Sequence, residues 1–383
     1  MAETLLLTNC SLYNKPGQRA DILMKDGIIS EIGETVSIEV PVERLDAGGR
    51  MVIPGLIDIH IQGAGGADIL DGTPEALQTI SKTLASLGVT GFLATTVVHS
   101  QKPNEHLRLA AEMSEKDLGG ARLLGVHLEG PFINPAKRGG ISPDSIYLPS
   151  KEALDNILEI TGSSLKMMTI APEMPGNDEI IRQLLDNNIV PSFGHSNAGY
   201  EETARSLRQG IPHVTHIFNA MRPLHHRNPG PLPAVFEDSN VTVQIISDGV
   251  HLHPGIIRML YRIIGPERCV CITDGVQAIG LPEGRYIYNT KEYESRGGAA
   301  RYPDGTLIGT AIGLNEIAWR FMEFTGCSPE EAVNAASLNP ARVLGLDAQK
   351  GSIAAGKDAD LVLLNADRGI AATIVAGRVV FRA

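Results

Sequence analysis

Polar residues at the ends of short apolar runs are the feature of this sequence that could do chemistry. Runs of strand length end in a histidine or a carboxylate, at His60, Glu129, His195, His216, Asp248 and Asp274. Imidazole and carboxylate in a three-ligand set with one open position are typical of a catalytic divalent metal that binds water. A single strand-end histidine is usually an ordinary hydrogen-bonded residue, but several that converge on one point favour a metal site.

Eight apolar runs of strand length, each ending in a polar residue, alternate with segments of helical periodicity. The runs are VIPGLIDIH, GFLATT, LLGVHLE, KMMTIAPE, IVPSFGH, HVTH, VTVQIISD and CVCITD, and TPEALQTISKTLASLG and NDEIIRQLLDNN lie between them. Near-continuous apolar strands that alternate with helices predict an α/β fold, the (β/α)8 TIM barrel, in which the carboxyl ends of all strands meet at one mouth. An open doubly wound sheet is the alternative, although no GxGxxG motif opens a first helix.

The two ends of the chain share a different pattern. TLLLTNCSLY and ADILMKDGIISEIGE at the beginning, and DADLVLLN and IAATIVAGRVVF at the end, read as short strands, with a tight turn at Asp26-Gly27. Neither end alone holds enough strands for a stable core. We therefore predict one small β-sandwich domain from residues 1–52 and 350–383, and a barrel from residues 53–349.

Composition narrows the class of protein. Of 383 residues, 33 are Lys or Arg and 44 are Asp or Glu, which gives a net charge of −11 and argues against nucleic-acid or anionic-membrane partners. No apolar stretch approaches the length of a membrane span, and the first residues lack the basic segment of a secretory signal. The four cysteines form no CxxC pair, so neither a disulfide framework nor a thiolate zinc site is expected. We predict a cytoplasmic protein.

Five motifs resemble one family of hydrolases. PGLIDIH at Pro54–His60, HLEGPF at His127–Phe132, GHSNA at Gly194–Ala198, THIFNAM at Thr215–Met221 and TDG at Thr273–Gly275 are similar to those of the N-acetylglucosamine-6-phosphate deacetylases, in the amidohydrolase superfamily. The tail GSIAAGKDADLVLLN at Gly351–Asn365 resembles the common C-terminal signature of that superfamily. The resemblance implies metal-dependent hydrolysis of N-acetyl-D-glucosamine 6-phosphate to D-glucosamine 6-phosphate and acetate.

The resemblance also implies roles for individual residues. It places the metal ligands on Glu129, His195 and His216, and the general base and acid on Asp274. It places substrate contacts on Gly140, Ile141, Asn219, Ala220, Arg227, Asp248, His251, Leu307, Ile308 and Gly309. Arg227 lies in a locally basic segment, and its guanidinium can bond two phosphate oxygens at once. Because this phosphate site is often completed across a subunit interface, the resemblance further implies a homodimer or a higher homo-oligomer.

The sequence departs from the family pattern at two positions. Superfamily members with two metals carry His-x-His on the first strand, whereas this chain has His60-x-Gln62. We therefore expect one tightly held divalent ion per subunit, with zinc as first choice and iron, manganese or cobalt as alternatives, and a second ion weak or absent. His60 and Gln62 are the candidates for a second metal site or for polarising the substrate carbonyl. Some single-metal members carry a lid histidine where this chain has Ile141, which leaves the oxyanion-stabilising role to His60 or to the metal.

Two related activities remain as alternatives at this stage. One is deacetylation of the galactosamine epimer, which differs at a single ring hydroxyl. The other is a cyclic-amide hydrolase; such enzymes typically bridge two metals with a carboxylated lysine, at the third-strand position that Glu129 occupies here.

Overall fold

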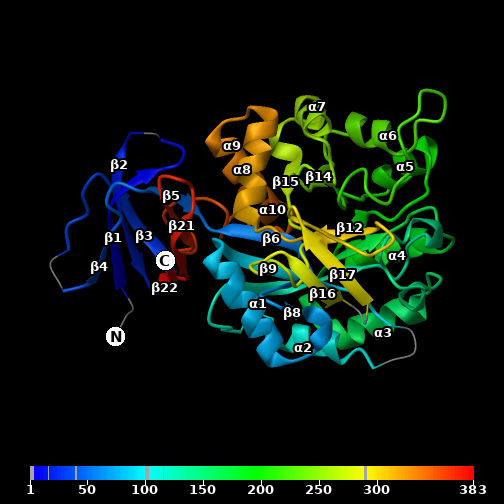
Figure 1. Ribbon diagram of the computed structural model, residues 1–383, viewed down its shortest axis with the longest axis horizontal. Helices are drawn as coiled ribbons and strands as arrows, with labels where there is room; N and C mark the ends of the chain where they lie inside the picture. The colour runs from blue at the N-terminus through cyan, green and yellow to red at the C-terminus, as the bar shows by residue number, and fades with distance from the viewer. Residues whose placement is uncertain (1–3, 16, 39–40, 100–102, 115, 289–290) are drawn as a thin grey trace.

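The computed structural model describes residues 4–15, 17–38, 41–99, 103–114, 116–288 and 291–383 (Figure 1). A helix-covered parallel sheet forms the larger body, and a smaller sheet made from both ends of the chain lies beside it. In these described ranges every helix falls short of the length and apolarity that crossing a membrane requires.

The larger sheet is a parallel barrel, eight-stranded within the described residues, with its strands in chain order. The segment after its last strand returns to the first, because the Asp274 amide donates to the His60 carbonyl at 2.9 Å and Gly275 bridges Ile61. This contact closes the ring, so the (β/α)8 prediction is confirmed and the doubly wound alternative is wrong. The strands are β6 (Leu56–Ile61), β9 (Val89–Thr96), β10 (Arg122–Glu129), β11 (Leu165–Ile170), β12 (Val190–Phe193), β13 (His213–Val214), β14 (Thr242–Ile245) and β15 (Cys269–Cys271).

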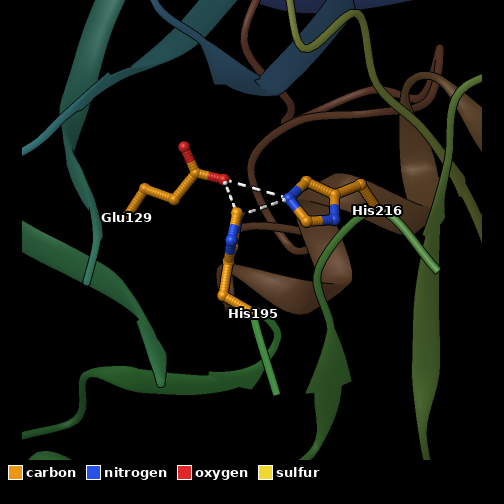
Figure 2. A group of neighbouring side chains, drawn as sticks. All are labelled: Glu129, His195 and His216. Atoms are coloured by element: carbon orange, nitrogen blue, oxygen red, sulfur yellow. Dashed lines mark hydrogen bonds and ion pairs between the residues drawn. The ribbon is translucent and has the colours of Figure 1, made fainter. Parts of the chain in front are cut away.

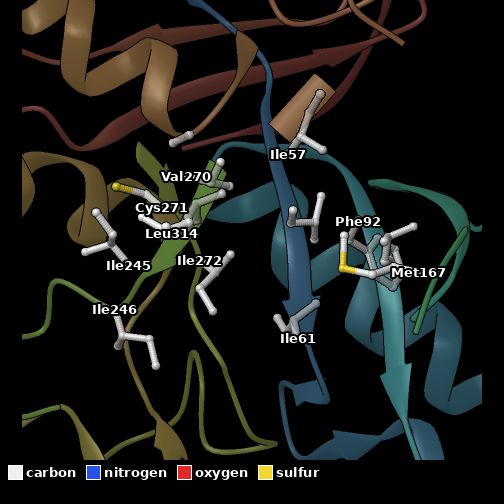
Figure 3. Close-up of a cluster of buried hydrophobic side chains, with 14 of the residues drawn as sticks. Ile57, Ile61, Phe92, Met167, Ile245, Ile246, Val270, Cys271, Ile272 and Leu314 are labelled. Carbon is white, nitrogen blue, oxygen red and sulfur yellow. The ribbon is translucent and has the colours of Figure 1, made fainter. Parts of the chain in front are cut away.

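Burial on both faces explains why the barrel strands read as unbroken apolar runs. Every residue of β6 and β9 is buried. Apolar side chains from several strands and from α8 pack into one continuous core, which includes Ile57, Phe92, Met167, Val270 and Leu314 (Figure 3).

The helices around the barrel follow the amphipathic pattern of the sequence. Helix α1 begins where the Thr73 hydroxyl accepts from the Ala76 amide, and it buries Leu77, Ile80 and Leu84 on one face. The helices are α1 (Pro74–Ser86), α2 (Glu105–Met113), α3 (Lys151–Thr161), α4 (Asn177–Asp186), α5 (Tyr200–Arg208), α6 (Leu232–Glu237), α7 (Pro254–Ile264), α8 (Leu314–Thr325), α9 (Pro329–Ala335) and α10 (Leu338–Val343). Short 3-10 segments lie at Ile69–Asp71, Pro135–Lys137, Pro143–Ser145, Gly162–Ser164 and Pro266–Arg268.

The smaller sheet combines strands from both termini around its own core. Its path runs β22-β21-β20-β5-β1-β2-β3, and β4 pairs with β1 off this path. Asp26 and Gly27 have φ of 49° and 80°, the left-handed pair that a two-residue hairpin between β2 and β3 requires. The strands are β1 (Thr4–Leu12), β2 (Arg19–Lys25), β3 (Ile28–Gly33), β4 (Glu43–Asp46), β5 (Met51–Pro54), β20 (Leu361–Leu364), β21 (Ile370–Val375) and β22 (Arg378–Arg382).

Two features differ from the expected elements. The run VIPGLIDIH, expected as one strand, forms two. Strand β5 pairs in the terminal sheet as far as Pro54, two residues beyond the expected domain boundary, and β6 begins the barrel at Leu56. Gly55 joins them where a Cβ would lie 2.0 Å from the Thr90 hydroxyl, so only glycine fits the crossing. In addition, an antiparallel sheet follows β15, formed by β16 (Gly284–Tyr288), β17 (Lys291–Arg296), β18 (Ala299–Arg301) and β19 (Leu307–Thr310); a small ribbon pairs β7 (Gly63–Ala64) with β8 (Ala67–Asp68).

Candidate active site

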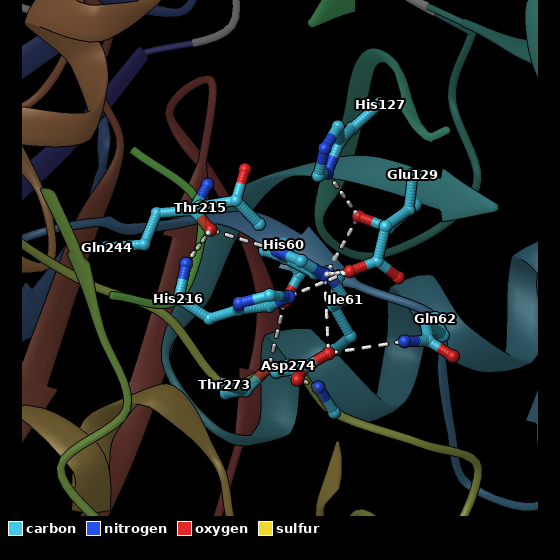
Figure 4. A network of polar contacts seen from close by, with 12 residues as sticks. His60, Ile61, Gln62, His127, Glu129, Thr215, His216, Gln244, Thr273 and Asp274 are labelled. Carbon is cyan, nitrogen blue, oxygen red and sulfur yellow. Dashed lines mark hydrogen bonds and ion pairs between the residues drawn. The ribbon is translucent and has the colours of Figure 1, made fainter. Parts of the chain in front are cut away.

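The carboxyl ends of the barrel strands bring the polar side chains together. Glu129 ends β10, while His216 and Asp274 follow β13 and β15 (Figure 4). His195 follows β12 (Figure 2). His195, His216 and Asp274 have positive φ, of 46°, 22° and 48°, in the left-handed region that non-glycine residues rarely adopt. Backbone strain of this kind persists where the surrounding structure holds a side chain in a required place.

Glu129, His195 and His216 form a compact cluster of potential ligand atoms (Figure 2). Glu129 Oε1 lies 2.9 Å from His195 Nε2 and 3.0 Å from His216 Nε2, and the two Nε2 atoms are 3.0 Å apart. Burial acts to raise the pKa of Glu129, but the charges of His60 and His195 and the hydrogen bonds of the imidazoles outweigh it and hold this pKa well below its usual value.

The proton positions in this cluster suit a metal ion. His195 Nδ1 contacts the Lys137 carbonyl at 2.7 Å, and because a carbonyl only accepts, Nδ1 carries the hydrogen. Nε2 is the ring atom that faces Glu129 Oε1 and His216 Nε2, so its lone pair is the one that would bind an ion held between these three atoms. The three atoms lie 2.9–3.0 Å apart, somewhat closer than the roughly 3.3–3.6 Å that separates tetrahedral ligands at bond lengths of about 2.0–2.2 Å, so small side-chain shifts would admit an ion.

Asp274 lies beside this cluster and is held by two neighbours. Its Oδ1 is 3.3 Å from His60 Nε2 and accepts from Gln62 Nε2 at 3.2 Å (Figure 4). Burial alone would raise the pKa of Asp274, but the charge of His60 outweighs it, so the pKa is lowered and the group is a carboxylate at neutral pH.

His60 lies between two carboxylates, those of Glu129 and Asp274. It is fully buried, its Nδ1 contacts Gln244 Oε1 at 2.9 Å, and its Nε2 lies 3.5 Å from Glu129 Oε1 as well as near Asp274. Burial lowers the pKa of His60, but the charges of Asp274 and Glu129 prevail and raise it well above its usual value. The partner residue of the motif, Gln62, uses its amide oxygen to accept from the Tyr288 hydroxyl at 2.6 Å.

Other buried polar groups hold the strand ends in place. Asp58 accepts from the Thr273 hydroxyl at 2.6 Å and from the His60 amide at 3.2 Å, and its burial raises its pKa to about 6. His127 lies between the hydroxyls of Thr95 and Thr169, at 3.1 and 2.8 Å, and its ring packs edge-on against that of His60. His127 therefore supports the site without being a ligand.

A pocket opens over the cluster and is lined by most of the residues implied by the resemblance. Besides Gln62, Glu129, His195, His216 and Asp274, the lining includes Gly140, Ile141, Asn219, Ala220, His251, Leu307, Ile308 and Gly309. Gly140 and Ile141 come from the loop after β10, and Leu307, Ile308 and Gly309 belong to β19.

Two of the expected substrate residues do not line this pocket. Asp248 is buried behind it and contacts His251 Nδ1 through Oδ2 at 2.6 Å, so it orients His251. Arg227 is exposed, and its guanidinium contacts His226 Nε2 at 2.7 Å.

The pocket also contains residues that sequence reasoning missed. Tyr288, at the end of β16, lines it together with Val97. Tyr288 belongs to the antiparallel insertion, where no metal-ligand spacing or strand-end pattern distinguishes it from the neighbouring tyrosines.

Comparisons with known proteins agree with this geometry. A model of the amidohydrolase family matches residues 51–380. An N-acetylglucosamine-6-phosphate deacetylase of Bacillus subtilis is 36% identical, over 100% of this chain and 98% of the relative. An N-acetylgalactosamine-6-phosphate deacetylase of Escherichia coli O157:H7 is 33% identical, over 89% of each chain. The solved structure of a mutant N-acetyl-D-glucosamine-6-phosphate deacetylase from Mycobacterium smegmatis, in complex with N-acetyl-D-glucosamine-6-phosphate, superposes with a TM-score of 0.89 at 29% identity and covers 99% of both chains.

Proposed function

This chain belongs to the amidohydrolase family, and we propose that it hydrolyses N-acetyl-D-glucosamine 6-phosphate to D-glucosamine 6-phosphate and acetate. The observation that carries this conclusion is one pocket lined both by a Glu-His-His cluster and by a carboxylate outside that cluster, Asp274. The similarity to relatives of that name over the whole chain supports the same activity.

Glu129, His195 and His216 would hold one divalent ion per chain. When bound, the ion lowers the pKa of a water molecule and polarises the acetamide carbonyl. We propose zinc, because two imidazoles and one carboxylate with an open position are its usual catalytic ligands, although iron, manganese and cobalt accept the same donor atoms.

Asp274 would move the proton in both halves of the reaction. As a carboxylate it takes a proton from the attacking water, and it then delivers that proton to the nitrogen of the departing amine. This transfer is needed because an amine is a poor leaving group without a proton. His60 and Gln62 keep Asp274 charged and aimed at the pocket by their contacts with Oδ1.

The remaining lining residues would orient the sugar phosphate. We propose that Leu307, Ile308 and Gly309 pack against the acetyl group, that Gly140 and Ile141 cover the site, and that Asn219, Ala220 and His251 contact the sugar phosphate. Arg227 is exposed and outside the pocket within one chain, so its proposed phosphate contact is best satisfied in a homodimer that shares the site. We also propose that the enzyme acts in the cytoplasm, in keeping with four free, buried cysteines.

The Arg227→Ala variant should chiefly weaken binding of the phosphorylated sugar. A charge-assisted hydrogen bond contributes about 1.5–3 kcal/mol, so KM for N-acetylglucosamine 6-phosphate should rise about 10- to 100-fold. Unphosphorylated N-acetylglucosamine is the control substrate, and its kcat/KM should barely change. Equal losses on both sugars would mean that Arg227 acts on the fold and not on the phosphate.

Comparison of N-acetylglucosamine 6-phosphate with its galactosamine epimer tests the identity of the substrate. One relative is an N-acetylgalactosamine-6-phosphate deacetylase, but it matches less of this chain, at lower identity, than the N-acetylglucosamine-6-phosphate deacetylase does. Acetate release should therefore proceed with a kcat/KM at least about tenfold higher on the glucosamine epimer, because a site that bonds the ring hydroxyl discriminates against its inversion. A higher kcat/KM on the galactosamine epimer would reverse the assignment.

A further inference from the structure

The chemistry of amide hydrolysis calls for a group that stabilises the developing oxyanion, a role that the sequence left to His60 or to the metal ion. Negative charge develops on the carbonyl oxygen, and donors aimed at that oxygen stabilise it. The lid side chain in the pocket is apolar Ile141, and His60 is fully buried and absent from the lining. This inference rests on the proposed deacetylase activity, and it concerns which side chain supplies such a donor.

A chain of two hydrogen bonds leads from the pocket wall to Asp274. The Tyr288 hydroxyl lies 2.6 Å from Gln62 Oε1, and Gln62 Nε2 lies 3.2 Å from Asp274 Oδ1. The Asp274 carboxylate can only accept, so the amide nitrogen of Gln62 must face it and the amide oxygen must face Tyr288. The Tyr288 hydroxyl is then the donor, and burial, which raises its pKa well above the usual value, keeps it protonated.

We propose that Tyr288 is a positioning residue that fixes the Gln62 amide with its nitrogen toward Asp274, and that Gln62 is the donor to the developing oxyanion. The amide nitrogen carries two hydrogens: one is bonded to Asp274, and the other is available to the pocket that Gln62 lines. Asp274 decides which end of the amide faces it, and the Tyr288 hydroxyl holds the opposite end in place. Without that hydroxyl the amide oxygen has lost its partner, so the side chain can shift and withdraw its nitrogen from both Asp274 and the substrate.

A double-mutant cycle tests this coupling in the full-length, metal-loaded enzyme. Tyr288→Phe keeps the ring and should lower kcat about tenfold, the equivalent of one hydrogen bond, with KM within about twofold. Gln62→Ala should lower kcat about 10²-fold, as expected for loss of one oxyanion donor. The double variant should be no slower than Gln62→Ala, because Tyr288 acts through Gln62. Tyr286→Phe is the matched control, since that hydroxyl donates to the Pro282 carbonyl at 2.6 Å and should leave kcat unchanged.

Several outcomes would overturn the inference. They are an unchanged kcat in Tyr288→Phe, a change in KM alone, or a tenfold loss that persists when Gln62 is already alanine. A crystal structure of Tyr288→Phe gives a readout independent of activity: Gln62 Nε2 should move beyond about 3.5 Å from Asp274 Oδ1, and an intact contact counts against the positioning role. If the unchanged chain released no acetate, the proposed function would fail, while the crystal structure would still decide whether Tyr288 orients Gln62.

Discussion

The Asp274→Asn variant is expected to lose about 10²- to 10⁴-fold in kcat on N-acetylglucosamine 6-phosphate. The amide is nearly isosteric with the carboxylate but cannot take a proton from water or deliver one to the amine nitrogen, and this is the usual cost of removing a general base and acid. The measurement is steady-state acetate release at saturating substrate.

Metal content and stability are the controls for this variant. Asp274 is not one of the clustered ligand atoms, so the variant should bind as much metal as the unchanged chain and should melt at a similar temperature. A kcat within about threefold of the unchanged enzyme would remove Asp274 from the mechanism.

The Glu129→Gln variant is expected to lose both bound metal and activity. One oxygen of Glu129 faces His195, His216 and His60 within 3.5 Å, so its negative charge holds the whole cluster. A neutral amide is a far poorer ligand, and loss of about 4 kcal/mol of charge stabilisation corresponds to about 10³-fold in kcat. Elemental analysis after dialysis, together with the acetate assay, measures both effects.

Asp274→Asn is the matched comparison for Glu129→Gln. Both remove one negative charge from the same pocket, but only Glu129 belongs to the Glu-His-His cluster. The expected pattern is metal retained in the first variant and lost in the second. A Glu129→Gln protein with full metal content would place the ion elsewhere.

The barrel was predictable from the sequence because burial on both faces leaves a direct trace in residue type. The run GFLATT becomes part of β9, whose residues are all buried, and the stretch NDEIIRQLLDNN becomes α4 with Ile180, Ile181 and Leu184 inward. The crossing at Gly55 was not predictable, because VIPGLIDIH is apolar throughout and its pairing partners in two different sheets come from distant parts of the chain.

The cluster of Glu129, His195 and His216 was predictable for a topological reason. Strands of a parallel barrel end at one mouth, so polar residues at several strand ends must approach one another. The contacts that orient these ligands and their neighbour His60 could not be predicted from the positions of the strand ends. The Lys137 carbonyl that sets the hydrogen on His195 and the Gln244 amide that meets His60 depend on side-chain packing.

Tyr288 shows the limit of pattern reading most clearly. It reaches the pocket from an antiparallel insertion whose strands were not expected, and RYIYN offers two tyrosines two residues apart. Only the folded arrangement shows that the Tyr288 hydroxyl meets Gln62, whereas that of Tyr286 meets the Pro282 carbonyl. The phosphate contact of Arg227 stays a prediction, because it depends on a second subunit.

Elemental analysis of the purified full-length chain, followed by chelation and metal return, tests the metal centre most directly. We predict one divalent ion per chain, with zinc the ion found, together with loss of acetate release on chelation and its recovery when one equivalent of zinc is restored. Undiminished hydrolysis by protein shown to be free of metal would refute the central claim that Glu129, His195 and His216 hold the ion on which the reaction depends.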